Sequence, residues 1–280
     1  FSQEGSELVT NGSFDTDSDW TKGTGWSISG GTANCDGTQT SSSDITQGLT
    51  TQSGKSYKIT YTISEYTSGS IFVRLNSGNT TTSQSSVGTF TEYLSGGNGT
   101  QISLRASADF IGSIDNVSVR EVGQDWTLNT GWSIGEDKAV AVTGAGSKLI
   151  QTNTLNGKTC KVTLTVSDYG GTSLILVDFG STSSSYITSN GTHTVYGTYD
   201  QDNFEIYKAS GFSGSITNIS VKEVGQNWAL GTGWSIGEDK VVGDGTAFTD
   251  VSQTPILIQN KKIKLTFDVL DYVSGTFRIR

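Results

Sequence analysis

The chain has 280 residues, of which 33% are hydrophobic and 16% are charged, and its net charge at pH 7 is −9. Its Lys and Arg residues are mostly scattered singly, so the clustered basic surface of a nucleic-acid-binding protein is not indicated. No apolar run approaches the roughly 18 residues of a membrane-spanning helix, and we therefore expect neither nucleic-acid binding nor membrane insertion.

A segment in the middle of the chain recurs almost unchanged. Residues 113–138 read SIDNVSVREVGQDWTLNTGWSIGEDK and residues 215–240 read SITNISVKEVGQNWALGTGWSIGEDK, a period of 215 − 113 = 102 residues. Residues 19–28 (DWTKGTGWSI) are a looser, earlier copy of the second half. A period near 100 exceeds the roughly 20–50 residues of solenoid repeats, so it indicates repeated domains. We predict one module over 1–122, a second over 123–224, and the first half of a third over 225–280.

Each module contains the same alternating pattern, at residues 55–66, 158–169 and 261–272. Alternation of apolar and polar residues predicts a strand with one buried face, and no window has the periodicity of a helix. A glycine turn and another alternating strand follow in the first and third copies, which reads as an antiparallel hairpin. We therefore predict an all-β protein of tandem antiparallel jelly-roll β-sandwiches, with the third module incomplete. The alternating apolar residues are Tyr57, Ile59, Tyr61 and Ile63; Cys160, Val162, Leu164 and Val166; and Ile263, Leu265, Phe267 and Val269.

The modules follow one another without a Pro/Gly/Ser-rich linker. The last strand of one passes into the next within about four residues, and short connections restrict relative motion, so a stiff rod is expected. Trp20, Trp126 and Trp228 stand where the modules begin and would wedge the junctions. Because the third module stops inside a strand, we expect the natural chain to continue past Arg280, and the segment at Phe1 to be internal or processed.

Catalytic and metal-ligand patterns are sparse. Cys160 occupies an inward apolar strand position, held by Tyr57 and Ile263 in the other copies, and Cys35 aligns with Ala141 in another module, which favours buried thiols over a disulfide. The presence of a single histidine, His193, argues against a catalytic triad. The acidic pairs 136–137 and 238–239 fall in glycine-bounded turns, where solvated acids are expected. We therefore predict no enzymatic activity.

Aromatic residues are the better binding candidates. Trp26, Trp132 and Trp234 each stand two residues before an Ile, so core packing is expected for them. A Tyr preceded by an acid ends the alternating strand of each module. Such a pair suits a sugar, through ring stacking and hydroxyl hydrogen bonds, although a Tyr that closes a sheet corner fits equally, and Arg74 on the next strand could join the site. The carbohydrate-binding candidates are Glu65, Tyr66, Arg74, Asp168, Tyr169, Asp271 and Tyr272.

Two motifs of the first module carry a resemblance to a known family. NGSFD at residues 11–15 and IDNVS at residues 114–118 resemble the opening and the terminal strand of carbohydrate-binding-module jelly rolls of the family 4/9/22 type. The resemblance implies a structural calcium held by Asp15 and Asp115, with oxygens near Asn11 and Gly12 as helpers. It implies this for the first module only, because Thr217 replaces Asp115 in the second. Asp115 shares the inward parity of Val117 and Val119, so we expect it to need compensation for burial.

The tandem form of these motifs is also similar to modules in structural proteins of marine bacteriophages, including tail and head fibres. The resemblance implies an extracellular protein at a virion surface, with other copies of itself, other virion or appendage proteins, and cell-surface glycans as partners. Two alternatives stay open. One is the polysaccharide-binding array of a secreted glycoside hydrolase, and the other is a bacterial surface or filament protein whose modules are spacers.

Overall fold

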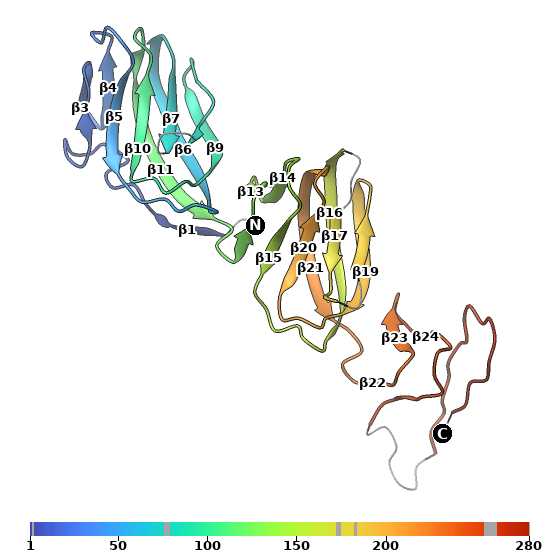
Figure 1. The fold of residues 1–280 in the computed structure, drawn as a ribbon. Coiled ribbons are helices and arrows are strands. Elements are labelled where there is room, and N and C mark those ends of the chain that lie inside the picture. The colour runs from blue at the N-terminus through green and yellow to red at the C-terminus, as the bar shows by residue number, and fades with distance from the viewer. Residues whose placement is uncertain (2, 76–78, 172–174, 182–183, 255–261, 280) are drawn as a thin grey trace.

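The computed structural model describes residues 1–280 except 2, 76–78, 172–174, 182–183, 255–261 and 280 (Figure 1). Throughout this described part the regular elements are strands and none is a helix. Every strand pairing is antiparallel. The predicted all-β fold class is therefore confirmed.

Residues 4–122 form two sheets that face each other, here called the first sandwich. One sheet has the order β3 (Trp26–Ser29), β4 (Thr32–Asp36), β11 (Ile111–Val122), β6 (Ser56–Ser68), β9 (Gly88–Ser95), and β1 (Glu4–Glu7) pairs with the far end of β11. The other has the order β2 (Thr21–Lys22), β5 (Ser43–Gly48), β10 (Gln101–Ala106), β7 (Ile71–Leu75), β8 (Asn79–Thr80).

Residues 126–223 repeat this strand order, and their two sheets are called the second sandwich. One sheet runs β13 (Trp132–Gly135), β14 (Lys138–Ala141), β21 (Ser213–Glu223), β16 (Thr159–Gly170), β19 (Gly191–Thr198). The other runs β12 (Trp126–Leu128), β15 (Ser147–Gln151), β20 (Phe204–Lys208), β17 (Ile175–Asp178), β18 (Ser184–Ile187). Each sandwich has its own cluster of buried apolar side chains. The division of the chain into three modules stays a prediction.

The alternation of the long strands explains both cores. The apolar residues of β6 and β16 are buried between the sheets, and the free thiols of Cys35 and Cys160 are buried with them. The outward face of the same strands is lined with threonines, whose hydroxyls pair across to the neighbouring strand, as between Thr62 and Thr89 (2.9 Å) and between Thr165 and Thr192 (3.0 Å). The half-buried strand predicted from the sequence is therefore confirmed in the first two copies.

The predicted hairpin after the long strand is wrong. β6 pairs with β9 and β11, whereas β7 pairs with β8 and β10 of the opposite sheet. The connection crosses between the two sheets at Gly69, which has a φ of +78°. A Cβ there would lie 2.4 Å from the backbone of Phe110. Alternation and a glycine turn reveal that the chain reverses, but they do not reveal which sheet receives the next strand.

The third segment is formed only in part. β22 (Ala229–Leu230) pairs with β25 (Val251–Ser252), and β23 (Trp234–Gly237) pairs with β24 (Lys240–Gly243), as their counterparts do in the second sandwich. The strand expected over 261–272 is wrong where the structure describes it: residues 262–272 form no strand, and Leu265 and Phe267 are exposed. The equivalent β6 is held by β9 and β11, and the described residues of the third segment contain no counterpart of either strand.

Candidate functional site

In the first sandwich, the tyrosine and its acid do not share a face. The ring of Tyr66 packs against the core, 6.5 Å from that of Phe110, and its hydroxyl donates to the carbonyl of Gly69 (3.1 Å). Glu65 is exposed, and its carboxylate accepts from the Ser113 hydroxyl (3.3 Å) on the outer face. Tyr66 therefore closes the sheet corner, as the alternative interpretation held, and its role in sugar binding stays a prediction.

The other two pairs resemble the first in part. Tyr169 packs edge-on against Phe212 at 5.4 Å. Asp168 has a φ of +55° and lies 3.4 Å from the Ser215 hydroxyl on the outer face. In the third segment, the Tyr272 hydroxyl donates to the carbonyl of Gly275 (2.8 Å), and Asp271 pairs with Lys240 (2.7 Å). The structure does not bring these aromatic rings and acids together into one binding surface.

Arg74 lies on the opposite side of the first sandwich from Glu65. It projects from β7 and lies 3.7 Å from Asp44, whose carboxylate also accepts from Arg105 at 2.8 Å. Because β7 and β6 belong to different sheets, Arg74 and Glu65 do not line one site.

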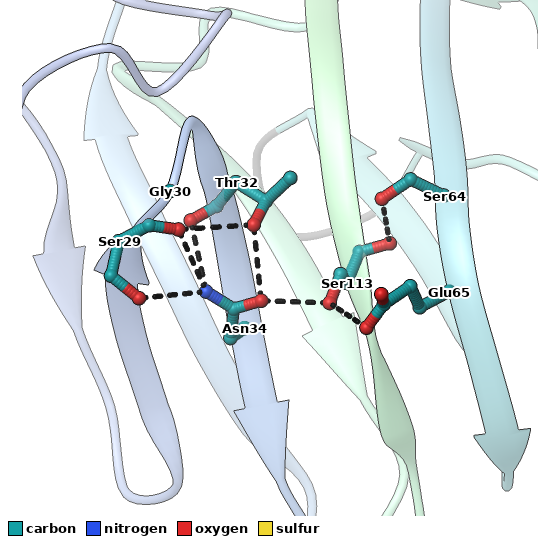
Figure 2. Close-up of a pocket in the computed structure, with 7 residues that line it drawn as sticks. All are labelled: Ser29, Gly30, Thr32, Asn34, Ser64, Glu65 and Ser113. Atoms are coloured by element: carbon teal, nitrogen blue, oxygen red, sulfur yellow. Dashed lines mark hydrogen bonds between the residues drawn. The ribbon is translucent and has the colours of Figure 1, made fainter.

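A shallow polar pocket lies on the outer face of the first sandwich, across β3, β4, β11 and β6 (Figure 2). The hydroxyl of Ser113 donates to the side-chain oxygen of Asn34 (2.7 Å), and the amide of Asn34 donates to the carbonyls of Ser29 (3.2 Å) and Thr32 (3.2 Å). Glu65 adds one carboxylate. These hydroxyl and amide groups, with the one carboxylate, can form hydrogen bonds to the hydroxyl groups of a ligand. The lining residues are Ser29, Gly30, Thr32, Asn34, Ser64, Glu65 and Ser113.

Sequence reasoning found Glu65 but missed the rest of this pocket. Asn34 and Ser113 meet only because β4 and β11 pair with Asn34 opposite Ser113, a register that no local motif encodes. The same register in the second sandwich places Val140 opposite Ser215. The network of Asn34 is therefore not repeated there.

The calcium candidates lie in the opening segment and on β11. The Gly12 carbonyl accepts from the backbone N–H of Val117 (2.9 Å), which places the opening segment beside the terminal strand. The Asn11 carbonyl accepts from the indole of Trp20 (3.0 Å), and the Asp15 carboxylate accepts from the Ser13 hydroxyl (2.6 Å). The backbone oxygens proposed as helpers thus already accept hydrogen bonds.

Asp115 differs from the expectation of a buried acid. It is half-buried, because a bulge at Asn116 (φ +53°) shifts the alternation before Val117. Its carboxylate accepts from the backbone N–H (2.6 Å) and the side-chain amide (3.0 Å) of Asn116. Within the described ranges, no group of three or more His, Cys, Asp or Glu residues could hold a metal ion. The calcium site stays a prediction.

The acidic pairs expected in turns do lie in turns. Glu136 and Asp137 both have positive φ (+47° and +62°) and join β13 to β14, and Glu238 and Asp239 do the same between β23 and β24. Positive φ at both central residues is the geometry of a tight hairpin turn. These carboxylates are therefore turn residues.

The contact between the first and second sandwiches is direct. β13 lies against β6 and β9 (Figure 1), and the backbone N–H of Ile134 donates to the Ser56 hydroxyl (3.0 Å). Ser56 and Ile134 are 1% and 2% exposed. Gly123 adopts a φ of +66°, and a Cβ there would lie 2.7 Å from Cγ1 of Ile134. The junction is thus closed by a buried side chain, a buried hydrogen bond and a glycine at a position where any Cβ would be both strained and crowded.

The same contact recurs 102 residues later. Gly225 has a φ of +68°, and a Cβ there would lie 2.9 Å from Ile236, while β23 lies beside β19.

The hydrogen bond of Lys58 to Glu4 raises the pKa of Lys58, and the charge of Asp137 across the first junction adds to this effect. At the second junction, the corresponding Lys161 lies over the Tyr196 ring at 5.6 Å.

Comparison with known proteins adds nothing to this geometry. No protein-family model matches the chain, and no curated protein matches it. The described part of the chain contains no candidate membrane-spanning helix.

Proposed function

We propose that the chain is a non-enzymatic structural protein, a rigid array of β-sandwich modules in a phage virion fibre or another extracellular surface appendage. The observation that carries the proposal is the repeated junction. Gly123 against Ile134 and Gly225 against Ile236 are the same contact, made twice at the sequence period. A protein whose modules moved freely would have no need to repeat a contact of this kind.

The buried hydrogen bond between Ile134 and Ser56 favours the aligned state of the junction. Bending it would separate β13 from β6 and β9, although the Ile134 side chain itself belongs to the core of the second sandwich. It would also break the buried hydrogen bond to Ser56, which costs about 1–3 kcal/mol when the partners stay unsatisfied. The bent state is therefore about 1–3 kcal/mol less stable, so between roughly one molecule in six and one in 150 would be bent at 25 °C.

Weak contact with glycans fits the same function. The polar pocket around Asn34 and Ser113 offers hydroxyl-binding groups but no large aromatic platform, so one pocket would bind weakly. Many such chains on one particle would raise the effective concentration of sites. Partners of this kind would be cell-surface glycans, other copies of the chain and other proteins of the appendage.

Two experiments test the proposal. Small-angle X-ray scattering of the full chain should give one extended shape, and inserting Gly-Gly-Ser-Gly-Gly after Val122 should broaden its distance distribution. Equal flexibility before and after the insertion contradicts the rigid array. Gold-labelled antibodies against the chain should decorate projecting fibres of the native particle in electron micrographs, whereas labelling of a soluble hydrolase would contradict the appendage.

A further inference from the structure

The opening segment of the chain lies along one edge of β11, and this edge with the side chains beside it is here called the groove. β1 pairs antiparallel with the last residues of β11, and beyond it the backbone N–H of Leu8 donates to the carbonyl of Val119 (3.0 Å). The backbone N–H of Val119 donates in turn to the Glu7 carboxylate (2.8 Å). The exposed peptide groups of a sheet edge are thereby paired.

Basic and hydroxyl side chains hold the acids of this segment. Lys58 donates to Glu4 (2.7 Å), Arg120 lies 3.3 Å from Glu7, and the Ser118 hydroxyl donates to Glu7 (2.6 Å). The segment is recognised by its carboxylates as well as by its backbone, which is how strand addition gains specificity.

An aromatic contact completes the groove at the junction. The ring of Phe1 lies 4.9 Å from that of Trp126, the first residue of β12, and Trp126 is 9% exposed. The occupant thus presents an aromatic residue, a carboxylate three positions later and a second carboxylate three positions after that, as Phe1, Glu4 and Glu7 do.

The second sandwich has the same groove along β21. Val162 lies opposite Val221 as Ile59 lies opposite Val119, so the N–H and C=O of Val221 face the edge that β1 covers on β11. β14 pairs with β21 only at residues 214–216, and among the described residues no strand pairs with 217–223 on that side. The side chains that form the groove have counterparts as well. Ser118 corresponds to Ser220, Arg120 to Lys222, Lys58 to Lys161 and Trp126 to Trp228.

The exposure of the matched residues shows that this second groove is open. Val119 is fully buried, whereas its counterpart Val221 is only half-buried. Apolar surface, unpaired edge groups and a lysine therefore coincide at one place.

We propose that the edge of β21 from Thr217 to Glu223, together with Trp228, binds an extended acidic peptide segment of a partner protein by strand addition. The segment carries an aromatic residue and two carboxylates at spacings of three, matching Trp228, Lys161 and Lys222. A partner protein is favoured over a second copy, because the opening segment of each copy is already held in its own groove at the high effective concentration of an intramolecular contact.

The test uses the full chain and a peptide of residues 1–12 (FSQEGSELVTNG) with fluorescein at its C-terminus. Fluorescence anisotropy at low salt should show one binding site per chain. Lys222→Glu should weaken binding about tenfold, because it replaces an attractive surface pair with repulsion. Trp228→Ala should weaken it too, whereas Lys22→Glu, on an exposed lysine of the first sandwich, should leave it unchanged.

Three results would overturn the proposal. The first is no binding of the peptide at millimolar concentration. The second is binding that Arg120→Glu weakens and Lys222→Glu does not, since the peptide would then be displacing the chain's own opening segment. The third is a dimer in sedimentation velocity without peptide that Lys222→Glu dissociates, since the occupant would then be a second copy.

Discussion

Replacing Gly123 with alanine tests how tightly the first junction is closed. The residue has a φ of +66°, where a side chain with a Cβ costs about 1–2 kcal/mol. The new Cβ would also lie 2.7 Å from Cγ1 of Ile134, and such overpacking costs about 1–3 kcal/mol more. Because Ile134 is buried, it has little room to move away, so Gly123→Ala should destabilise the second sandwich by about 2–5 kcal/mol.

Gly157→Ala is the matched control. Gly157 has a φ of +79°, but nothing lies within 4 Å of the position of its Cβ. It should therefore show only the backbone cost of about 1–2 kcal/mol. Urea unfolding followed by tryptophan fluorescence compares the two variants. Equal losses of stability in the two variants would refute the reasoning, because the close approach of the new Cβ to Ile134 would then add no cost to that of the backbone.

Three further predictions concern the cores and the pocket. Burial raises the pKa of Tyr199, whose hydroxyl is buried and has no hydrogen-bond partner among the described residues. Since the unfolded chain loses this proton first, stability should fall as pH rises above about 10. Tyr199→Phe should lessen this fall, to which Tyr61 still contributes because burial raises its pKa to about 12, and should add about 1–3 kcal/mol at neutral pH, as measured by urea unfolding across pH. Burial also raises the pKa of the Cys35 and Cys160 thiols, so a thiol reagent at pH 8 should label them only on unfolding, and fast labelling of the native chain would contradict their burial. Asn34→Val, which copies Val140 of the second sandwich, should abolish any signal on a glycan array while leaving the unfolding midpoint nearly unchanged; an undiminished signal would place glycan binding elsewhere.

The fold could be predicted from the sequence where local chemistry decides it. Alternation in residues 55–66 placed Ile59 and Ile63 inside, and the pairing of Trp26 with Ile28 placed both in the core, as the structure shows. Local patterns could not say that the chain crosses to the opposite sheet at Gly69, because that depends on packing against Phe110. Nor could they show the bulge at Asn116 that turns Asp115 toward solvent.

The candidate site was less predictable for the same reason. The pairs of tyrosine and acid were visible as neighbours in sequence, but adjacent residues of a strand face opposite sides, so Tyr66 packs inward while Glu65 faces out. The polar pocket depends on the register that sets Asn34 opposite Ser113. The junction contact of Gly123 with Ile134 was signalled only by the recurrence of the whole segment.

The rigid array is tested most directly by the distance between two spin labels, one on each sandwich. Ser41→Cys and Thr152→Cys place the labels at exposed positions, while the native cysteines Cys35 and Cys160 are buried. Double electron–electron resonance on this variant should give one narrow distance distribution, and the five-residue insertion after Val122 should broaden it. A broad distribution without the insertion would contradict the account, because the junction would then be a flexible link.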